Sequence, residues 1–527
     1  MNHAYGEDIE VSLVALISQV KQKTYQDSVR LMRVSETVSN LQAVTQAIVA
    51  MGTAANKRVL AEVGLMTDMV AQAEANDLVI VIEAESDTAA QQALARAEAI
   101  LAESTVTETQ DQQSIPVRTF EQAKRSLSAA NLALISVPGP HAKLEAAKAL
   151  NAGMHVFMFS DNVTLADELA LKQWAVSKGL LMMGPGCGTA IINGVALAFA
   201  NVVRRGPVGV VGASGTGLQE VTSLIDRGGG GISQAIGVGG RDLSESIGGL
   251  MMMQGITMLS NDPATEVIVL ISKPPAESVM AHMLDGARRS GKPVVVNFLG
   301  SGRQGEEKGI IFTTTIEDTA KAALQQANRT NAIHFGIDPV EQDKLAAGER
   351  QRLSAGQTYL RGLFSGGSLC DEAMVILHQY LPGIYSNIPL MPEYALEDAW
   401  QSKEHSCIDL GEEEFTQGRP HPMIDLRLRQ ERLLAEAEDP TVAVILLDVV
   451  IGYGSHDNPA GALGPTIKAA KDRAAAQGRY LPVITHVCGT AQDPQGLQQQ
   501  EQILREAGAL VLPTNAQAAR VAAAIIS

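Results

Sequence analysis

Aromatic residues, cysteines and basic residues are all scarce in this 527-residue sequence. Aromatic residues make up 4% of it, against 46% for hydrophobic residues as a whole. Such an excess of aliphatic and small residues is typical of α/β proteins, whose parallel sheets are covered by helices on both faces. Lysine and arginine number 41 against 58 acidic residues, which gives a formal net charge of −17. This deficit of positive charge argues against a nucleic-acid partner, because a phosphate backbone needs a basic face.

The four cysteines lie far apart and form no CxxC pair; they are Cys187, Cys370, Cys407 and Cys488. This spacing argues against a disulfide framework and a zinc ribbon, and it favours reduced thiols in the cytoplasm. No HExxH or clustered Cys/His pattern is present, so we expect no metal site. Cys187 lies in a glycine-rich turn, where we expect a small buried side chain in preference to a nucleophile.

We expect neither a signal peptide nor a membrane segment. Met1–Ala15 carries three acidic residues instead of a basic stretch followed by an apolar core. No charged residue occurs between Lys178 and Arg204. Gly184–Gly188 and Asn193-Gly194 would nevertheless break a membrane-spanning helix there and expose backbone polar groups to lipid. We interpret this stretch as a buried strand and turn.

Short apolar runs alternate with helical patterns, which predicts an α/β fold with doubly wound parallel sheets and ligand loops after the strands. The first strands are expected at Val11–Val20, Ala47–Met51, Leu78–Glu83, Leu132–Val137 and His155–Ser160. We predict a first domain over residues 1–203, a second over 204–326, a polar linker over 327–353 and a third domain over 354–527.

The clearest candidate site is the stretch Gly206–Glu220. Val208–Val211 has the pattern of a buried strand, and Leu218–Asp226 has helical spacing. The glycine turn between them offers backbone N–H groups and hydroxyls at the positive end of a helix dipole, which suits a phosphate or a carboxylate. The predicted anion-binding residues are Ser214, Gly215, Thr216 and Gly217. The alternative is a purely structural turn in which the serine caps the helix.

Two more glycine turns follow expected strands. The turn after Gln234–Val238 supplies Gly239 and Gly240. The turn after Tyr359–Phe364 repeats the strand–glycine–serine–helix order, and its candidates are Ser365, Gly366, Gly367 and Ser368. Because this order repeats the central arrangement, we predict a second anion-binding cradle there.

Two histidines are candidates for a general base or a positioning group. His421 lies between prolines beside Asp425, and its alternative role is to hold the backbone of a turn. His456 follows the strand Val442–Leu447, which ends at Asp448. An aspartate–histidine pair there would orient the imidazole, whereas the alternative is a solvated loop.

Several motifs occur in an order that resembles the α subunit of succinyl-CoA synthetase over roughly the first three-fifths of the chain. They are Val137–His141, Ala152–His155, Gly184–Gly188, Gly209–Glu220, Gly237–Gly240 and Asn261–Glu266. Val442–Ile526 resembles the C-terminal flavodoxin-like domain of the β subunit. The resemblance is closest to the FdrA family, through the motifs Phe159–Thr164, Gly212–Gly217, Ser272–Pro275 and Pro420–Asp425.

The resemblance implies a Rossmann-like CoA-binding-type domain followed by flavodoxin-like doubly wound domains, as in succinyl-CoA synthetase without its ATP-grasp domain. CoA is then the possible cofactor, and its implied contacts are Gln26, Asp27, Ser28, Lys57 and Pro138. Members of the FdrA family are implicated in anaerobic allantoin breakdown, as the oxamate carbamoyltransferase subunit that acts with two companion subunits.

The sequence departs from the ligase pattern at three places. Succinyl-CoA synthetase relays phosphate through a histidine, but no histidine occurs here between His282 and His334. Lys273 stands where a glutamate steadies the phosphohistidine. The segment Thr24–Ser28 lacks the glycine of the family's CoA loop. These departures argue against ATP-driven ligation, whereas a cation at position 273 favours a bound phosphate or carboxylate.

The leading hypothesis is an enzyme subunit that acts on a carbamoyl or acyl phosphate, most concretely one that converts oxalurate and phosphate to oxamate and carbamoyl phosphate. The predicted catalytic residues are Lys273, His421, His456 and Asp448. The alternatives are an acid–thiol ligase with ATP handling supplied by a partner, and a non-catalytic scaffold or ligand-sensing subunit. We expect small carboxylate and phosphate ligands, companion subunits or a homo-oligomer, and neither nucleic acid nor membrane as a partner.

Overall fold

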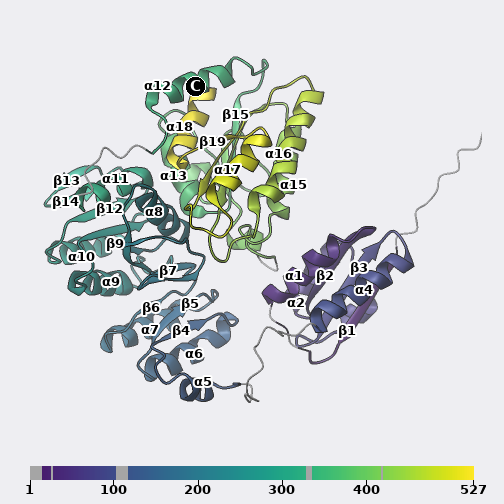
Figure 1. The fold of residues 1–527 in the computed structure, drawn as a ribbon, viewed down its shortest axis with the longest axis horizontal. Coiled ribbons are helices and arrows are strands. Elements are labelled where there is room, and N and C mark those ends of the chain that lie inside the picture. Colours follow the sequence, from purple (N-terminus) through teal and green to yellow (C-terminus); the bar gives the residue numbers. More distant parts are fainter. Residues whose placement is uncertain (1–14, 25, 27, 103–116, 328–334, 417–418) are drawn as a thin grey trace, which may run out of the picture. The chain divides into compact units, whose positions relative to one another are not determined.

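The computed structural model describes residues 15–24, 26, 28–102, 117–327, 335–416 and 419–527 (Figure 1). The chain forms two compact units. The first is the N-terminal part up to Pro116 together with Thr416–Pro420, and the second comprises Val117–Phe415 and His421–Ser527. Within the described ranges, every helix is too short or too polar to span a bilayer.

The first unit is built on a three-stranded antiparallel sheet in the order β1-β3-β2. Its elements are β1 (Ala15–Lys21), α1 (Ser28–Ser39), β2 (Val44–Met51), α2 (Ala54–Glu62), α3 (Asp68–Gln72), β3 (Leu78–Ala84) and α4 (Asp87–Ala102). The prediction of a parallel doubly wound sheet is wrong for this part of residues 1–203. Helix α1 joins β1 to β2, but β3 lies between these two strands in the sheet. The alternation of strand and helix in the sequence does not reveal such an insertion. Residues 11–14 of the first expected strand lie outside the described residues.

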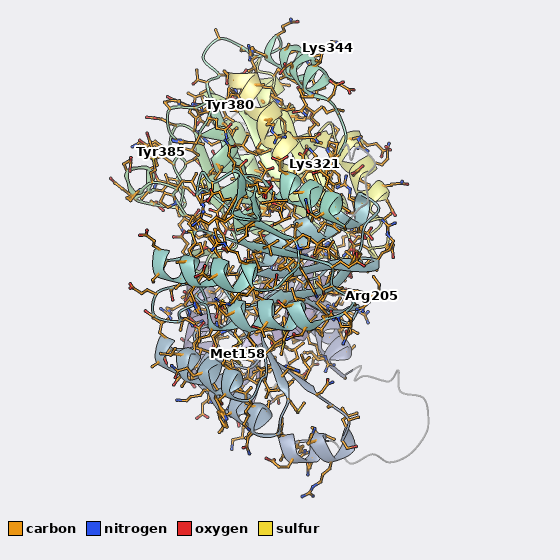
Figure 2. All side chains as sticks on the ribbon, turned by 90° about the vertical axis from the view of Figure 1, so that its left-hand side faces the viewer. Met158, Arg205, Lys321, Lys344, Tyr380 and Tyr385 are labelled. Atoms are coloured by element: carbon orange, nitrogen blue, oxygen red, sulfur yellow. The ribbon has the colours of Figure 1, made fainter. Side chains whose placement is uncertain are left out.

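The second unit begins with a three-stranded parallel sheet in the order β4-β5-β6. Its elements are α5 (Phe120–Ser126), β4 (Leu132–Ile135), α6 (Gly139–Asn151), β5 (His155–Met158), α7 (Leu165–Ser177) and β6 (Met182–Met183). Here the predicted parallel alternation is confirmed. Figure 2 labels Met158 at the end of β5.

An eight-stranded sheet follows, in the order β13-β14-β12-β11-β9-β10-β7-β8. Its strands are β7 (Thr189–Ile192), β8 (Val195–Ala198), β9 (Arg205–Gly212), β10 (Ile232–Gly237), β11 (Val267–Ser272), β12 (Val294–Phe298), β13 (Gly305–Glu307) and β14 (Ile310–Phe312). Its helices are α8 (Gly215–Arg227), α9 (Leu250–Asn261), α10 (Glu277–Arg288) and α11 (Ile316–Gln326). β10, β9, β11, β12 and β14 run parallel, and the strand order reverses between β9 and β11. β7 and β8, which precede the predicted boundary after residue 203, also belong to this sheet.

The last sheet has five parallel strands in the order β16-β15-β17-β18-β19. Its strands are β15 (Tyr359–Phe364), β16 (Ser406–Asp409), β17 (Val442–Val450), β18 (Val483–Cys488) and β19 (Leu510–Leu512). Its helices are α13 (Gly367–Leu377), α14 (Glu413–Thr416), α15 (Arg427–Glu438), α16 (Pro459–Ala476), α17 (Leu497–Glu506) and α18 (Asn515–Ile526), and a short 3₁₀ helix, η1, spans Pro392–Tyr394. This is the flavodoxin-like order that the sequence predicted, with its reversal between β15 and β17.

The expected linker over residues 327–353 contains a helix, α12 (Pro339–Arg350). Its last residue, Arg350, donates a hydrogen bond to the carbonyl of Ile525 in α18, and Tyr480 donates one to Glu349. Asp338 caps the helix, and Pro339 occupies its first turn. Only Ala346 of this helix is fully buried, so few of its positions require an apolar residue. The polar composition that results made the stretch resemble a linker.

The last two sheets share one apolar core, to which Leu224 of α8, Leu369 of α13 and Ala519 of α18 all contribute. Polar contacts also join α11 to the start of α18. Glu317 of α11 accepts a hydrogen bond from Thr514 and pairs with Lys321, which Figure 2 shows where α11 meets α18. These contacts hold the N-termini of the helices in a fixed arrangement.

Glu372 of α13 is the buried carboxyl at this junction. It accepts hydrogen bonds from the backbone N–H of Ile316 at 2.6 Å and from the side chain of Asn515 at 2.8 Å. Burial, together with the negative charges of Glu220 and Glu317, raises the pKa of Glu372 to about 7, although its two hydrogen-bond donors oppose the shift.

Glu372→Gln is expected to change how stability depends on pH. The carboxyl of the folded protein stays protonated up to pH about 7, whereas that of the unfolded chain ionises near pH 4.5. The wild type should therefore lose up to about 3 kcal/mol relative to the glutamine variant as the pH rises from about 4.5 to 7. Urea denaturation of both proteins across this range measures the difference, and parallel pH profiles would contradict the prediction.

Candidate functional site

The site candidates gather at the carboxyl ends of β9 in the eight-stranded sheet and of β15 in the five-stranded sheet. β9 ends at Gly212 and is followed by Ser214, which caps α8 by accepting a hydrogen bond from the N–H of Gly217 at 2.9 Å. β15 ends at Phe364 and leads through the second glycine turn into α13. Both turns lie at topological switch points, the places where open α/β sheets bind ligands.

The two helix N-termini meet each other. The hydroxyl groups of Ser214 and Ser368 are hydrogen-bonded, although 154 residues separate them in the sequence. A Cβ atom on Gly366 would lie 2.7 Å from the methyl carbon of Thr216, so only glycine fits there. Ser214 is partly exposed, whereas Thr216 is buried.

Four backbone N–H groups remain available at this meeting point. They belong to Gly215, Thr216, Gly367 and Ser368, the first two residues of α8 and of α13. Within the part of the chain that the structure describes, no hydrogen bond uses any of the four. Each helix leaves such donors unpaired at its start, and here two sets with the same positive dipole end converge.

The second predicted cradle is filled in part by a side chain of the protein itself. The backbone N–H groups of Ser365 and Gly366 both donate to the carboxylate of Asp448 at 2.9 Å, and the hydroxyl of Ser365 donates to it as well. Arg429 pairs with the same carboxylate at 2.8 Å. Asp448 is fully buried inside β17 and does not follow its end. The interpretation of Ser365 and Gly366 as anion ligands is therefore wrong, and Asp448 supports the turn.

Lys273 follows β11 and lies close to α13. Its ammonium group is 3.0 Å from Asp371 Oδ2, and its side chain is 57% exposed. Burial alone would lower the pKa of Lys273, but Asp371, with Asp409 and Glu412 nearby, raises it, so the lysine stays charged. Lys273 was expected to be a free cation for a ligand, but it forms an ion pair with Asp371.

Asp409 is a residue that the sequence analysis did not single out. It ends β16 and is 3% exposed, and its Oδ1 accepts a hydrogen bond from the N–H of Gly411 at 2.9 Å. A Cβ atom on Gly367 would lie 2.5 Å from its Oδ2, so the carboxyl group rests on the start of α13. Its position at the end of a parallel strand, just before Glu412, was the signal that could have identified it.

His421 is buried and contacts the same loop. Its Nδ1 accepts a hydrogen bond from the N–H of Met423, and its Nε2 would lie 2.7 Å from a Cβ atom on Gly411. Burial, with the charge of Arg429, lowers the pKa of His421 to about 4, although Asp448 opposes the shift. The imidazole is therefore neutral near pH 7, which suits a positioning role better than that of a general base.

His456 is not paired with Asp448 as predicted. Its Nδ1 accepts a hydrogen bond from the N–H of Asn458, and its backbone N–H donates to the carbonyl of Met423. Asp448 takes Arg429 as its ionic partner instead. The sequence placed both residues after one strand, but β17 continues through Asp448 to Val450 and separates them.

The third glycine turn packs beside the first. The N–H of Val238 donates to the carbonyl of Gly212, and a Cβ atom on Gly239 would lie 2.6 Å from the carbonyl oxygen of Pro185. Gly240 has open space around its Cβ position. The turn ends at Asp242, which pairs with the buried Lys172, so this loop is held from within.

The implied CoA contacts are divided between the two units. Gln26, which accepts a hydrogen bond from Arg30, and Lys57, which donates to the carbonyl of Ala71, belong to the first unit, whereas Pro138 precedes α6 in the second. Asp27 lies outside the described residues, as does the side chain of Ser28. The antiparallel sheet of the first unit removes the reason for expecting a Rossmann-type CoA loop there.

The cysteines are free and buried. Cys187 is buried, as expected for a small packing residue, and this burial raises the pKa of its thiol to about 12. In the described ranges, no group of histidine, cysteine, aspartate and glutamate side chains could hold a metal ion.

Three family models match successive parts of the chain. Residues 14–116 match "AllF, heavy metal-associated domain", residues 203–300 match "CoA binding domain" and residues 363–525 match "CoA-ligase". The CoA-binding match thus falls on the domain around β9 to β12, and the first unit matches a different model. The 14–116 segment contains no cysteine, the usual soft ligand of heavy metals.

Two CoA-ligase subunits match part of the chain. Succinate–CoA ligase subunit alpha of Aquifex aeolicus is 28% identical over 42% of this chain and 74% of its own, and sulfoacetate-CoA ligase subunit SauD of Bilophila wadsworthia is 28% identical over 38% and 69%. Among solved structures, PH0766 from Pyrococcus horikoshii is 15% identical, covers 75% of this chain and 83% of its own, and gives a TM-score of 0.28, too low to support an argument.

The protein YahF of Escherichia coli is 48% identical over 93% of this chain and 95% of its own length. That identity extends across both units. The chain therefore belongs to the family of YahF, with CoA-binding and CoA-ligase domains that are homologous to those of succinyl-CoA synthetase α subunits.

Proposed function

We propose that the chain is an enzyme subunit that transfers a carbamoyl or acyl group to phosphate at the meeting point of α8 and α13. The most concrete reaction is the attack of phosphate on oxalurate, which gives oxamate and carbamoyl phosphate. The observation that carries the proposal is the convergence of four unpaired N–H groups, from Gly215, Thr216, Gly367 and Ser368. One relative is the α subunit of a CoA ligase, so we include companion subunits in the proposal.

Oriented N–H donors are what this chemistry requires. Phosphate carries two negative charges that the helix ends bind, and the carbonyl oxygen becomes an oxyanion when phosphate attacks. Neither step needs a phosphohistidine, and residues 283–333 contain no histidine. In many reactions of this kind, positioning and electrostatic stabilisation together supply most of the rate enhancement.

The direct test is reconstitution of the full chain with its companion subunits. With saturating oxalurate and phosphate, carbamoyl phosphate should accumulate in step with oxamate, and omission of phosphate should abolish both products. Absence of carbamoyl phosphate under these conditions would overturn the carbamoyl-transfer proposal.

Lys273→Met is expected to raise the KM for phosphate roughly 10-fold, which is about 1.4 kcal/mol of binding. The variant leaves the carboxyl group of Asp371 without its cation, and the site then presents less positive charge to the anion. Lys344→Met is the matched control, because Lys344 is exposed on α12 and is labelled in Figure 2. If the chain is only a scaffold, both variants should behave as the wild type.

The CoA-ligase match favours one alternative, an acid–thiol ligase whose ATP handling comes from a partner. That function predicts CoA binding with a Kd at or below about 1 mM and phosphorylation of a residue in the complex. The contacts that it implies for CoA belong to both units of the chain. A calorimetric titration with CoA that releases no heat would reject the alternative.

A further inference from the structure

We propose that Asp409 is the proton carrier of the reaction, which delivers its proton to the leaving nitrogen and regains one from the attacking hydrogen phosphate. The inference rests on the proposed function and adds the residue that handles the proton. It stands on the placement of one buried carboxyl group against the first residue of α13, beside the unpaired N–H groups.

Asp409 lies beside the start of α13, at the meeting point of α8 and α13. Its Oδ1 is fixed by the N–H of Gly411, while within the described residues no hydrogen bond uses Oδ2. Oδ2 lies over Gly367, at 2.5 Å from the position that a Cβ atom would take, and Ser368 is the next residue. A carboxyl oxygen that makes no hydrogen bond within the described residues therefore lies next to two of the N–H donors that bind the substrate.

The charged groups around Asp409 favour its neutral form. Burial, Glu412 and Asp371 raise the pKa of Asp409 to about 8, although the N–H of Gly411 and the charge of Lys273 oppose the shift. Lys273 forms its ion pair with Asp371, and His421, on the other side of Gly411, is neutral near pH 7. A carboxylic acid is thus available as a donor at neutral pH, as general acid catalysis requires.

The proton balance closes without another reactant. An oxygen of hydrogen phosphate bonds to the carbamoyl carbon of oxalurate, and the bond from that carbon to the bridging nitrogen breaks. The electron pair of that bond goes to nitrogen, which takes a proton from Asp409 and leaves as the amide of oxamate. The proton of hydrogen phosphate returns Asp409 to its acid form, and carbamoyl phosphate departs.

The first measurement needs no activity. Infrared spectra of the full chain at pH 7 should contain the carbonyl stretch of a protonated carboxyl group, which Asp409→Asn removes and which fades above pH about 8. Asp343→Asn on α12, an exposed position, should leave the band unchanged. A spectrum in which Asp409→Asn removes no such band would overturn the inference, whatever the activity.

The second measurement uses the reconstituted complex. Asp409→Asn should lower kcat for carbamoyl phosphate formation roughly 100-fold, with little change in the KM for phosphate. The wild-type kcat should fall above pH about 8, whereas the residual rate of the variant should not. An unchanged kcat would overturn the inference while leaving the proposed function intact. A wild-type complex that shows the band but forms no carbamoyl phosphate would overturn both.

Discussion

Lys172→Met is expected to lower the free energy of unfolding of the second unit by about 3–5 kcal/mol, the cost of leaving buried charge without its partner. Lys172 lies on α7 and is completely buried. Its ammonium group is 2.8 Å from Glu168 and 2.7 Å from Asp242, and it donates a hydrogen bond to the carbonyl of Val238 at 3.0 Å. One buried cation therefore serves two buried carboxylates.

The two carboxylates keep only part of their support in the variant. Asp242 still accepts hydrogen bonds from the N–H groups of Met251 and Met252 at the start of α9. Glu168 still pairs with Arg241, whose side chain is 44% exposed. The loss should be largest in the loop that carries Gly239 and Gly240, because Asp242 anchors its end.

Urea denaturation followed by circular dichroism measures the effect. Lys172→Met/Glu168→Gln should recover at least half of the lost stability, because it removes one of the two buried carboxylates that Lys172 neutralises. Lys143→Met is the matched control, since it breaks an exposed pair with Asp167 of α7 and should cost less than about 1 kcal/mol. Equal losses for the two lysine variants would show that Lys172 acts through packing alone.

The parallel sheets could be predicted from the sequence because each strand is a short apolar run followed by a helix with a readable cap. Ser214, for example, is both a predicted ligand and the observed cap of α8. The parallel direction of the strands joined by these helices then followed from the doubly wound pattern. The contact of Ser214 with Ser368 could not be predicted, because it depends on how two separate sheets pack through their common core.

The first unit shows the limit of pattern reasoning. Its strands were placed nearly correctly, since β3 was expected at Leu78–Glu83 and is found at Leu78–Ala84. Its topology was not, because β1 and β2 pair with β3 on either side. Pairing is a long-range choice that alternation of apolar runs does not encode.

The second glycine turn shows a different limit. The residues Ser365–Ser368 have the composition of an anion cradle, and the N–H groups of Ser365 and Gly366 do bind an anion. That anion is Asp448, which is 83 residues distant from Ser365 in the sequence. Composition predicted the chemistry of the turn, but only the fold decides whether the protein or a ligand supplies the carboxylate.

Arg429→Met is expected to destabilise the second unit by about 3–5 kcal/mol and also to lower activity. Arg429 is 2% exposed, and one of its nitrogens donates to the Asp448 carboxylate at 2.8 Å and to the carbonyl of Leu363 at 3.0 Å. Methionine fills a similar volume but leaves Asp448 charged and fully buried. The donors of Ser365 and Gly366 then hold a carboxylate that has lost its cation.

The activity should fall because the same carboxylate fixes the turn that leads into α13. When Asp448 shifts, the N–H groups of Gly367 and Ser368 lose their fixed direction toward α8, and misplacement by about 1 Å can cost about 100-fold in rate. Arg429→Met/Asp448→Asn should restore at least half of the stability, because the buried group is then neutral and still accepts from the turn.

Arg427→Met is the control on the same helix, two residues earlier. Its guanidinium is 55% exposed and pairs with Asp425, so its loss should cost less than about 1 kcal/mol and leave the rate unchanged. Urea denaturation and the carbamoyl phosphate assay report the two effects separately. If Arg429→Met lost stability but kept full activity, the turn before α13 would not position the donors, and the site would depend on α8 alone.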